Sequence, residues 1–176
     1  VNRSYGFVVG DNGTLMRIQK LGTPGESWRV WRYPIPVEYD LKHVFFHNRY
    51  IGWVVGQYGV ILKTSNGGWN WSIVSDQNAN SFNAVQFINQ DTGWAAGSNG
   101  KIYKSVDGGV NWLLINTGIA NQFNALHFFD ENTGWLVGRD GTILSTIFDD
   151  ESPVSEIENE IENLETYILS QNYPNP

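Results

Sequence analysis

The stretch "SVDGGVNW", Ser105 to Trp112, decides the fold because the chain contains it twice. Forty-one residues earlier the sequence reads "TSNGGWNW", Thr64 to Trp71, and both stretches fit the pattern hydroxyl-x-Asp/Asn-x-Gly-x-Asn-Trp. A fixed period of this size is typical of proteins that stack one supersecondary unit many times. An acidic, glycine-rich loop can also bind calcium, so the surrounding residues must be checked for further oxygen ligands.

The repeat extends over most of the chain. Three copies align without gaps and open with "LKHVFF" from Leu41, "FNAVQF" from Phe82 and "FNALHF" from Phe123. Each continues with a Gly-Trp-x-x-Gly segment, and an earlier copy begins with "YGFVVG" at Tyr5. The extra residues of that earlier copy fall in expected loops, where insertions are tolerated. We therefore expect four related units at about 1–40, 41–81, 82–122 and 123–148.

Each full unit predicts four short strands, which in the third unit are expected at 82–88, 93–97, 101–106 and 111–115. Asn99-Gly100 and Asp140-Gly141 predict tight turns between the second and third strands, since both central residues of such a turn need positive φ. Four-stranded repeats of about forty residues indicate the blades of an all-β propeller. A single β-sandwich is the alternative, and the exact repetition argues against it. About three and a half antiparallel blades are present, so we expect them to be part of a larger propeller.

Composition excludes several classes of function. The chain of 176 residues has no cysteine, so disulfides and thiolate metal sites are excluded. From Asp149 onward there are eight acids and no Lys or Arg, whereas residues 1–148 hold ten acids and eleven bases. A near-neutral body gives no electrostatic case for binding nucleic acid. No apolar run reaches the length of a membrane span.

The two boxes resemble Asp-box (BNR) repeats. The whole unit "GWAAGSNGKIYKSVDGGVNW" is similar to the repeats of photosystem II stability/assembly factor-like propellers, and the resemblance covers about residues 1–148. It implies that the box is the turn between the third and fourth strands of a blade. The box residues are then structural, and they are Thr64, Asn66, Gly68, Trp71, Ser105, Asp107, Gly109 and Trp112.

The chemistry of the box residues gives them the same role. Asp107 and Asn66 can accept backbone N–H groups within the turn, and Gly109 permits backbone angles that a Cβ would forbid. A calcium loop needs several oxygen ligands and is commonly closed by a glutamate. Asp107 has no carboxylate two, four or eleven residues further on, so we expect no metal and no cofactor. Trp71 and Trp112 are expected to anchor the fourth strands in the core.

A second aromatic position recurs on the second strand of every unit. It holds Phe7, Trp53, Trp94 and Trp135. Stacking on a carbohydrate is one interpretation, but recurrence in every blade favours packing between blades. We therefore expect these rings in the core and not in a ligand site.

The sequence contains no recognisable set of catalytic residues. Sialidases also carry Asp boxes on a propeller, and their chemistry needs an arginine cluster and a tyrosine nucleophile backed by a glutamate. The arginines of this chain do not fall at matching repeat positions, and His43, His47 and His127 form no metal-ligand pattern. We expect a non-catalytic binding or scaffold module. One alternative is a glycan-active hydrolase with catalytic residues in other blades, and another is an assembly factor for a membrane protein complex.

The expected ligand surface is the face that bears the loops between the second and third strands and between successive units. These loops vary from unit to unit, as a contact surface for a protein or a glycan would. A set of solvated loops explains the same variation. The candidate residues are Tyr39, Gln57, Tyr58, Ser98, Asn99, Arg139 and Asp140, with Tyr33 as a further aromatic.

The chain changes in character after Phe148. Residues 149–167 are acidic, and we expect a linker with transient helix because their apolar residues follow heptad spacing. The last nine residues, "ILSQNYPNP" from Ile168, resemble the opening of the C-terminal sorting domain of Por, or type IX, secretion substrates. This resemblance implies export across the outer membrane, a secreted or cell-surface location, and the secretion machinery as a partner.

Both ends of the sequence fall inside recognisable patterns. The chain starts within a repeat unit and stops within the sorting motif, so we expect a piece of a longer polypeptide. Open blade edges at the two ends predict self-association unless further blades cover them.

Overall fold

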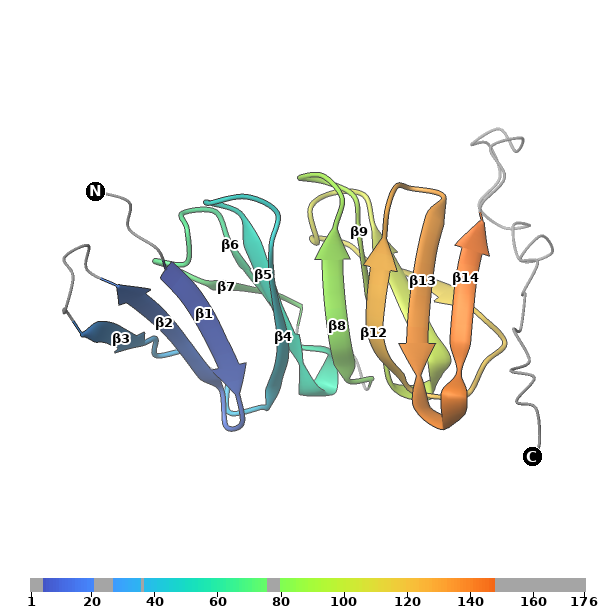
Figure 1. The fold of residues 1–176 in the computed structure, drawn as a ribbon, viewed down its shortest axis with the longest axis horizontal. Coiled ribbons are helices and arrows are strands. Elements are labelled where there is room, and N and C mark those ends of the chain that lie inside the picture. Colours follow the sequence, from blue (N-terminus) through green and yellow to red (C-terminus); the bar gives the residue numbers. More distant parts are fainter. Residues whose placement is uncertain (1–4, 21–26, 36, 76–79, 148–176) are drawn as a thin grey trace, which may run out of the picture.

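The computed structural model describes residues 5–20, 27–35, 37–75 and 80–147, and it shows an all-β chain. Four antiparallel sheets of three or four strands stand side by side in a row (Figure 1). Each sheet is a meander, in which strands that follow one another in the sequence are neighbours in the sheet. The predicted propeller blades are therefore confirmed, and the sheets are called blades 1 to 4 in chain order.

The strands of the blades follow the repeat. Blade 1 contains β1 (Tyr5–Gly10), β2 (Thr14–Lys20) and β3 (Trp28–Arg32), and blade 2 contains β4 (Leu41–Phe46), β5 (Gly52–Gly56), β6 (Ile61–Thr64) and β7 (Ser72–Ser75). Blade 3 contains β8 (Phe82–Phe87), β9 (Gly93–Gly97), β10 (Lys101–Ser105) and β11 (Leu113–Asn116). Blade 4 contains β12 (Phe123–Phe128), β13 (Thr133–Gly138) and β14 (Ile143–Ile147). Within the described residues blade 1 has no first strand and blade 4 has no fourth, as the repeat predicted.

The fourth strand of a blade starts later than predicted. β11 begins at Leu113, two residues after the expected start. The Asn111 N–H still donates to the Asp107 carboxylate, at 2.9 Å, so the preceding turn is longer than the sequence pattern suggested. The other three strands of this blade agree with the prediction to within one residue.

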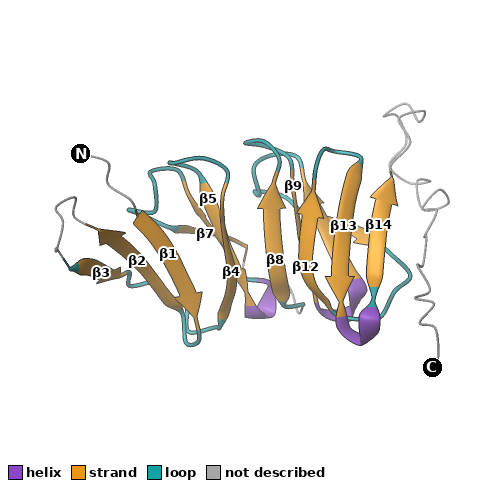
Figure 2. Cartoon of the chain, viewed as in Figure 1, coloured by secondary structure: helices purple, strands orange, loops and turns teal. Residues whose placement is uncertain are grey.

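The turns between second and third strands have the predicted backbone. Asn99 and Gly100 have φ of 59° and 64°, and Asp140 and Gly141 have φ of 55° and 71°. Tyr58 adopts the same left-handed conformation in blade 2, with φ of 54°. Three of these turns are single 3-10 turns at the lower end of the blades in Figure 2, namely η1 (Gln57–Gly59), η2 (Ser98–Gly100) and η3 (Arg139–Gly141).

The two glycines of the Gly-Trp-x-x-Gly segment make room for the first strand of the same blade. A Cβ on Gly93 would overlap the Phe87 ring, and a Cβ on Gly97 would overlap the Ser81 carbonyl oxygen. That carbonyl accepts the Ser98 N–H at 2.9 Å, which fixes the start of the first strand against the turn. The same close approaches occur in blades 2 and 4, and they explain why the glycine spacing recurs.

The core of the molecule lies between neighbouring blades. The Trp53 ring of blade 2 stacks on Phe87 of blade 3 with centroids 3.6 Å apart, and Trp94 of blade 3 stacks on Phe128 of blade 4 at 3.9 Å. Both indoles are fully buried. Phe7 takes the same place between blades 1 and 2. The recurring aromatic position therefore packs blades together at Phe7, Trp53 and Trp94. Trp135 of blade 4 is 46% exposed, so the expectation that this ring lies in the core is wrong.

Side chains also join the first strands of adjacent blades. Gln86 on β8 donates through Nε2 to the Phe128 carbonyl at 2.9 Å and accepts the Phe128 N–H through Oε1 at 2.7 Å. Asn83 donates to the Phe123 carbonyl at 2.7 Å. These bonds connect β8 to β12 although the two strands belong to different sheets.

Residues 148–176, which include the predicted acidic linker and the sorting motif, lie outside the described part of the chain. Residues 21–26 lie outside it as well. Within the residues that the structure describes, no helix has the length and apolar character needed to cross a membrane.

Candidate functional site

The box between β10 and β11 is a network of local hydrogen bonds. The Ser105 hydroxyl accepts the Gly109 N–H at 2.8 Å and donates to Asp107 Oδ1 at 2.9 Å. The same Oδ1 accepts the N–H groups of Val110 at 3.0 Å and Asn111 at 2.9 Å. The Asn111 N–H is the largest of the causes that hold the pKa of Asp107 below its usual range. The carboxylate is therefore engaged by the turn itself.

The box of blade 2 makes the same bonds with an amide in place of the carboxylate. Thr64 Oγ1 accepts the Gly68 N–H at 3.0 Å, and Asn66 Oδ1 accepts the N–H groups of Trp69 and Asn70 at 3.1 Å and 2.9 Å. Because a neutral amide completes the turn as a carboxylate does, the turn requires no cation. Among the described residues, no three or more His, Cys, Asp or Glu side chains gather as a metal site would need.

The glycines and the tryptophan of the box complete the turn. Gly68 and Gly109 have φ of 76° and 89°, in the region that glycine adopts without strain. Trp112 Nε1 donates to the Gly109 carbonyl at 3.0 Å, and its ring meets Phe87 edge-on with centroids 5.8 Å apart. Trp71 meets the corresponding phenylalanine of blade 2 in the same way. All these contacts hold the fourth strand against the blade.

The box also contacts the preceding blade. Trp53 Nε1 donates to the Gly108 carbonyl at 3.0 Å, so the second strand of blade 2 is bonded to the box of blade 3. Between blades 1 and 2, Phe7 approaches Gly68 so closely that a Cβ there would overlap its ring. Trp94 Nε1 is buried and has no hydrogen-bond partner among the described residues. The box thus belongs to the interface between blades.

One recurring turn was not predicted. The loops after β4, β8 and β12 are closed by Asn48, Asn89 and Asp130, each of which accepts two backbone N–H groups through its side chain. These hydrogen bonds lower the pKa of Asp130, the Asn132 N–H most strongly. The signal in the sequence was the 41-residue spacing of the three side chains.

A buried cation between blades was not predicted either. Arg17 on β2 is buried, and its guanidinium lies 4.7 Å from the Tyr5 ring centroid and 4.2 Å from that of Trp69 in the next blade. Lys63 and Lys104 hold the equivalent position in blades 2 and 3, where each ammonium lies over the indole of its own second strand. The sequence does contain a signal for this position, because a Lys or Arg recurs on the third strand of blades 1 to 3.

Three of the predicted ligand-face residues are tied to the fold. Gln57 Oε1 accepts the Asp40 N–H at 3.3 Å, and Ser98 Oγ accepts the Ser81 N–H at 2.9 Å. Asn99 Nδ2 donates to a side-chain oxygen in the loop before β8 at 3.2 Å. In blades 2 and 3 these side chains connect the turn between the second and third strands to the loop that precedes the first strand. They therefore stabilise the loops of this face.

Two tyrosines form an exposed pair on this face. The rings of Tyr39 and Tyr58 have centroids 4.9 Å apart at 61°, and the two residues are 40% and 57% exposed. Tyr58 has a left-handed backbone at the position where the other blades place Asn12, Asn99 and Asp140. Asparagine and aspartate tolerate this conformation, whereas a bulky aromatic residue there is strained. Backbone strain of this kind concentrates at functional sites.

Charged groups accompany the tyrosine pair. Asp40 follows Tyr39 in the sequence. Its carboxylate accepts the Asn12 N–H at 3.2 Å and a hydrogen bond from Lys42 Nζ at 3.2 Å. The Asn12 N–H is the main cause that lowers the pKa of Asp40, followed by Lys42. Arg139 and Asp140 are exposed on the corresponding turn of blade 4. This loop face offers aromatic, anionic and cationic contacts.

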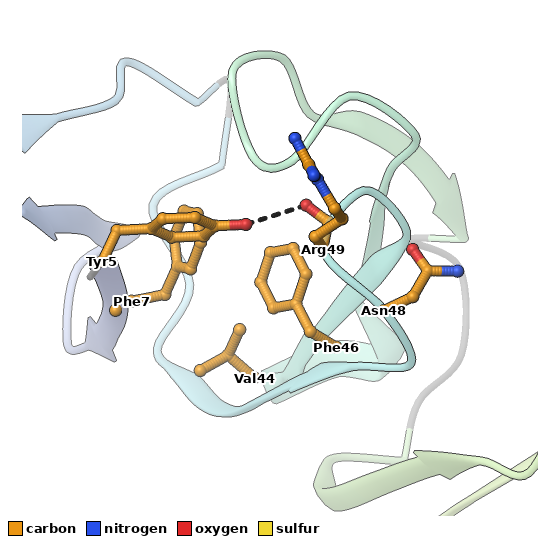
Figure 3. A pocket seen from close by; sticks show the side chains of 7 residues that line it. Tyr5, Phe7, Val44, Phe46, Asn48 and Arg49 are labelled. Atoms are coloured by element: carbon orange, nitrogen blue, oxygen red, sulfur yellow. Dashed lines mark hydrogen bonds between the residues drawn. The ribbon is translucent and has the colours of Figure 1, made fainter. Parts of the chain in front are cut away.

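A hollow of about 480 Å³ lies at the opposite end of blades 1 and 2 (Figure 3). It is lined by Tyr5, Gly6, Phe7, Val44, Phe46, Asn48 and Arg49, and the Tyr5 hydroxyl donates to the Arg49 carbonyl at 2.9 Å between its two walls. The hollow lies beside the free edge of β1, where the described part of the blade 1 sheet has no first strand. The repeat predicted that blade 1 has no first strand, but it did not predict that the side chains beside this edge leave a hollow.

Repeated meander blades, boxes that close the third and fourth strands, and rings stacked between blades define a β-propeller of the BNR type. The chain belongs to the family of the photosynthesis system II assembly factor YCF48, whose model matches residues 1–80 and 73–147. The resemblance of the repeat to this family is therefore confirmed. The likeness of residues 168–176 to a sorting domain stays a prediction.

Solved propellers share the fold of the chain. The structure of YCF48 bound to D1 peptide aligns with a TM-score of 0.63 and 22% identity over 86% of this chain and 48% of that chain. YCF48 from Cyanidioschyzon merolae aligns with a TM-score of 0.61 and 17% identity over 80% of this chain and 49% of that chain. An ancestral GH74 enzyme aligns with a TM-score of 0.55 and 15% identity, over 81% of this chain and 22% of the enzyme. The chain spans about half the length of the two YCF48 structures. No curated protein matches the chain in sequence.

Proposed function

We propose that the chain is part of a non-catalytic propeller that binds a segment of another protein through its loop face at Tyr39 and Tyr58. The observation that carries the proposal is the conformation of Tyr58. A left-handed backbone costs a residue with a Cβ roughly 1–2 kcal/mol, and the other three blades lessen this cost with Asn or Asp. In return Tyr58 presents an exposed ring beside Tyr39, and tyrosine is enriched where protein interfaces form.

The relatives support a protein as the ligand. The matching family is described as an assembly factor, and one similar structure is YCF48 bound to a D1 peptide. Those words concern the relatives, and for this chain they favour a protein segment over a glycan. Mixed charges beside an aromatic pair also suit a peptide, which offers side chains of both signs.

A narrower form of this function is the assembly of a membrane protein complex. Membership of the family favours it, whereas the predicted sorting motif from Ile168 argues against a photosynthetic complex. The amount of each assembled membrane complex in cells without the gene tests the idea. Loss of one complex while its subunits are still synthesised is expected, and unchanged complexes would contradict it.

The proposal assigns no catalysis to this part of the propeller. The carboxyl groups with a shifted pKa among the described residues are Asp40, Asp107 and Asp130, and hydrogen bonds from turn N–H groups lower all three. The general acid of a glycosidase needs a raised pKa instead. The similarity to the GH74 enzyme is one of fold. Turnover of a sialoside by the purified protein would contradict this part of the proposal.

We further propose that the protein is exported by type IX secretion to the cell surface or the medium. The support is the sequence "ILSQNYPNP" from Ile168, which lies outside the described residues. Fractionation of cells with and without a functional type IX system tests the proposal. We expect the protein outside the first cells and inside the second, and retention in both would contradict export.

Selection of a phage-displayed peptide library on the immobilised chain tests the binding proposal. Enriched peptides should bind Tyr58→Asn and Tyr39→Ala at least about 10-fold more weakly than the natural chain, as expected for aromatic contacts at the centre of an interface. Tyr50→Ala is the matched control, since Tyr50 is 51% exposed on a loop at the other end of blade 2. No enrichment, or equal binding to Tyr58→Asn, would contradict the proposal.

A further inference from the structure

The free face of blade 4 is an uncovered copy of the interfaces inside the molecule. On this face Trp135 is 46% exposed, Val137 44% and Ile143 42%. The equivalent residues of blades 2 and 3 are only 0–2% exposed, and they are Trp53, Val55, Ile61, Trp94, Ala96 and Ile102. We call Trp135, Val137 and Ile143 the blade 4 face. Blade 4 therefore exposes the apolar surface that the following blade covers in blades 2 and 3.

The internal interfaces show what fits such a surface. The first strand of the following blade, six residues long, covers it in each case. The last residue of that strand, Phe87 or Phe128, stacks on the indole. Side chains of the covered blade hold the backbone of the strand, as His43 Nδ1 accepts the Val85 N–H at 3.3 Å and Gln86 bonds both backbone groups of Phe128. The occupant of the blade 4 face should therefore be an extended segment with the same pattern.

One segment of the chain has this pattern at the right place. "LETYIL", Leu164 to Leu169, begins 41 residues after Phe123, at the spacing that also separates Leu41, Phe82 and Phe123. Its large apolar side chains include positions one, four and six, as in "FNAVQF" and "FNALHF". Leu169 stands at the position of the stacking phenylalanine.

The connection to this segment also has the right length. From the end of the third strand to the next first strand, Thr64 to Phe82 and Ser105 to Phe123, the chain advances 18 positions. From Ile147 to Leu164 it advances 17. A segment at residue 164 can therefore reach the neighbouring blade position as β8 and β12 do.

We propose that Leu164–Leu169 docks on the blade 4 face as the first strand of a following blade, with Leu169 over the Trp135 indole. Asn124 and His127 hold the repeat positions of the two side chains that bind the β12 backbone from blade 3, and both are exposed. Residues 148–163 are then the connection between two blades, and the strand includes residues 164–167 of the predicted linker and the first two residues, Ile168 and Leu169, of the predicted sorting motif. This proposal is independent of the loop-face function.

The hollow beside β1 is another place where a strand is missing within the described residues. Residues of β1 and β4 and of the loop after β4 line it. Blade 1 stands at the end of the row of blades opposite to β14 (Figure 1). The repeat spacing leads from β14 to the blade 4 face, so we assign the segment there.

Hydrogen–deuterium exchange on the 176-residue chain tests the proposal. The backbone N–H groups of residues 164–169 should exchange at least about 10-fold more slowly than those of residues 149–160 at every protein concentration, because a docked strand must detach before it exchanges. Trp135→Asp and Leu169→Asp should each remove this protection. Trp28→Asp is the matched control, since Trp28 is 55% exposed on the edge of blade 1, and it should leave the protection unchanged.

Three results would overturn the proposal. The first is exchange of residues 164–169 at the unprotected rate while β12 and β13 stay protected. The second is protection that appears only as the protein concentration rises, which would place the segment on a second copy. The third is protection that withstands Trp135→Asp and is lost with Val44→Asp, which would place the segment in the hollow beside β1.

Discussion

The indole N–H of Trp53 donates to the carbonyl of Gly108 at 3.0 Å, which connects the second strand of one blade to the box of the next. The box from Ser105 to Trp112 therefore forms one side of the interface between blades 2 and 3, and Trp53 of blade 2 lies on the other side. Residues that meet in this way are not accessible to a ligand. The box identifies the architecture, and the proposed function lies on the loop face with Tyr39 and Tyr58.

Trp53→Phe tests the hydrogen bond between blades. The substitution keeps an aromatic ring against Phe87, as Phe7 does against Phe46 in the native chain, but removes the donor to Gly108. We expect the free energy of unfolding in urea to fall by about 1–2 kcal/mol, the cost of one buried bond and some lost packing. An unchanged stability would show that the bond between Trp53 and Gly108 contributes nothing.

Asp107→Asn and Asp107→Ala separate hydrogen bonding from charge in the box. Asparagine should preserve the turn, because Asn66 makes the same bonds in blade 2. Alanine leaves the N–H groups of Val110 and Asn111 without their acceptor, and we expect a loss of about 1–2 kcal/mol in urea unfolding. Equal losses for both variants would mean that the negative charge, and with it a cation, matters to the turn.

The stability of the chain should fall on mild acidification because of His43. Burial lowers the pKa of this histidine, and its Nδ1 accepts the Val85 N–H, which only the neutral ring can do. Below a pH of about 6.5 the unfolded chain binds a proton that the folded chain does not, so the free energy of unfolding decreases as the pH falls. Urea unfolding between pH 8 and 5 measures this slope. His43→Gln should reduce it, and an unchanged slope in that variant would contradict the assignment.

Tyr58→Asn should stabilise the fold while it weakens binding. Asparagine tolerates the left-handed backbone that Tyr58 adopts, so we expect the free energy of unfolding to rise by about 0.5–1 kcal/mol. Thermal unfolding by circular dichroism measures the change. A loss of stability would show that Tyr58 serves mainly to pack against Tyr39.

The blades were predictable because several local signals agree. Asn99-Gly100 specifies a left-handed turn, Ser105 and Asp107 specify the next one, and the 41-residue period repeats both. The strand order follows once these turns are placed. The start of β11 was wrong by two residues because the bond from Asn111 to Asp107 extends the turn, and an isolated pattern does not show that bond.

The arrangement of the loop face was not predictable to the same degree. Tyr39 and Tyr58 were both candidates, but their contact depends on how the loop entering blade 2 returns to the turn between β5 and β6. The roles of Gln57 and Ser98 within that face depend on the same return. Arg17 is buried because Trp69 comes from another blade, and a single-strand pattern contains no such information.

The unfolding free energy of Trp94→Ala tests the central claim most directly, namely that the recurring aromatic position holds blades together. Trp94 is fully buried and stacked on Phe128, so we expect a loss of about 3–5 kcal/mol in urea unfolding. Trp28→Ala is the control, because Trp28 is 55% exposed and its loss should change stability by about 0.5 kcal/mol or less. A Trp94→Ala protein as stable as the control would contradict the account.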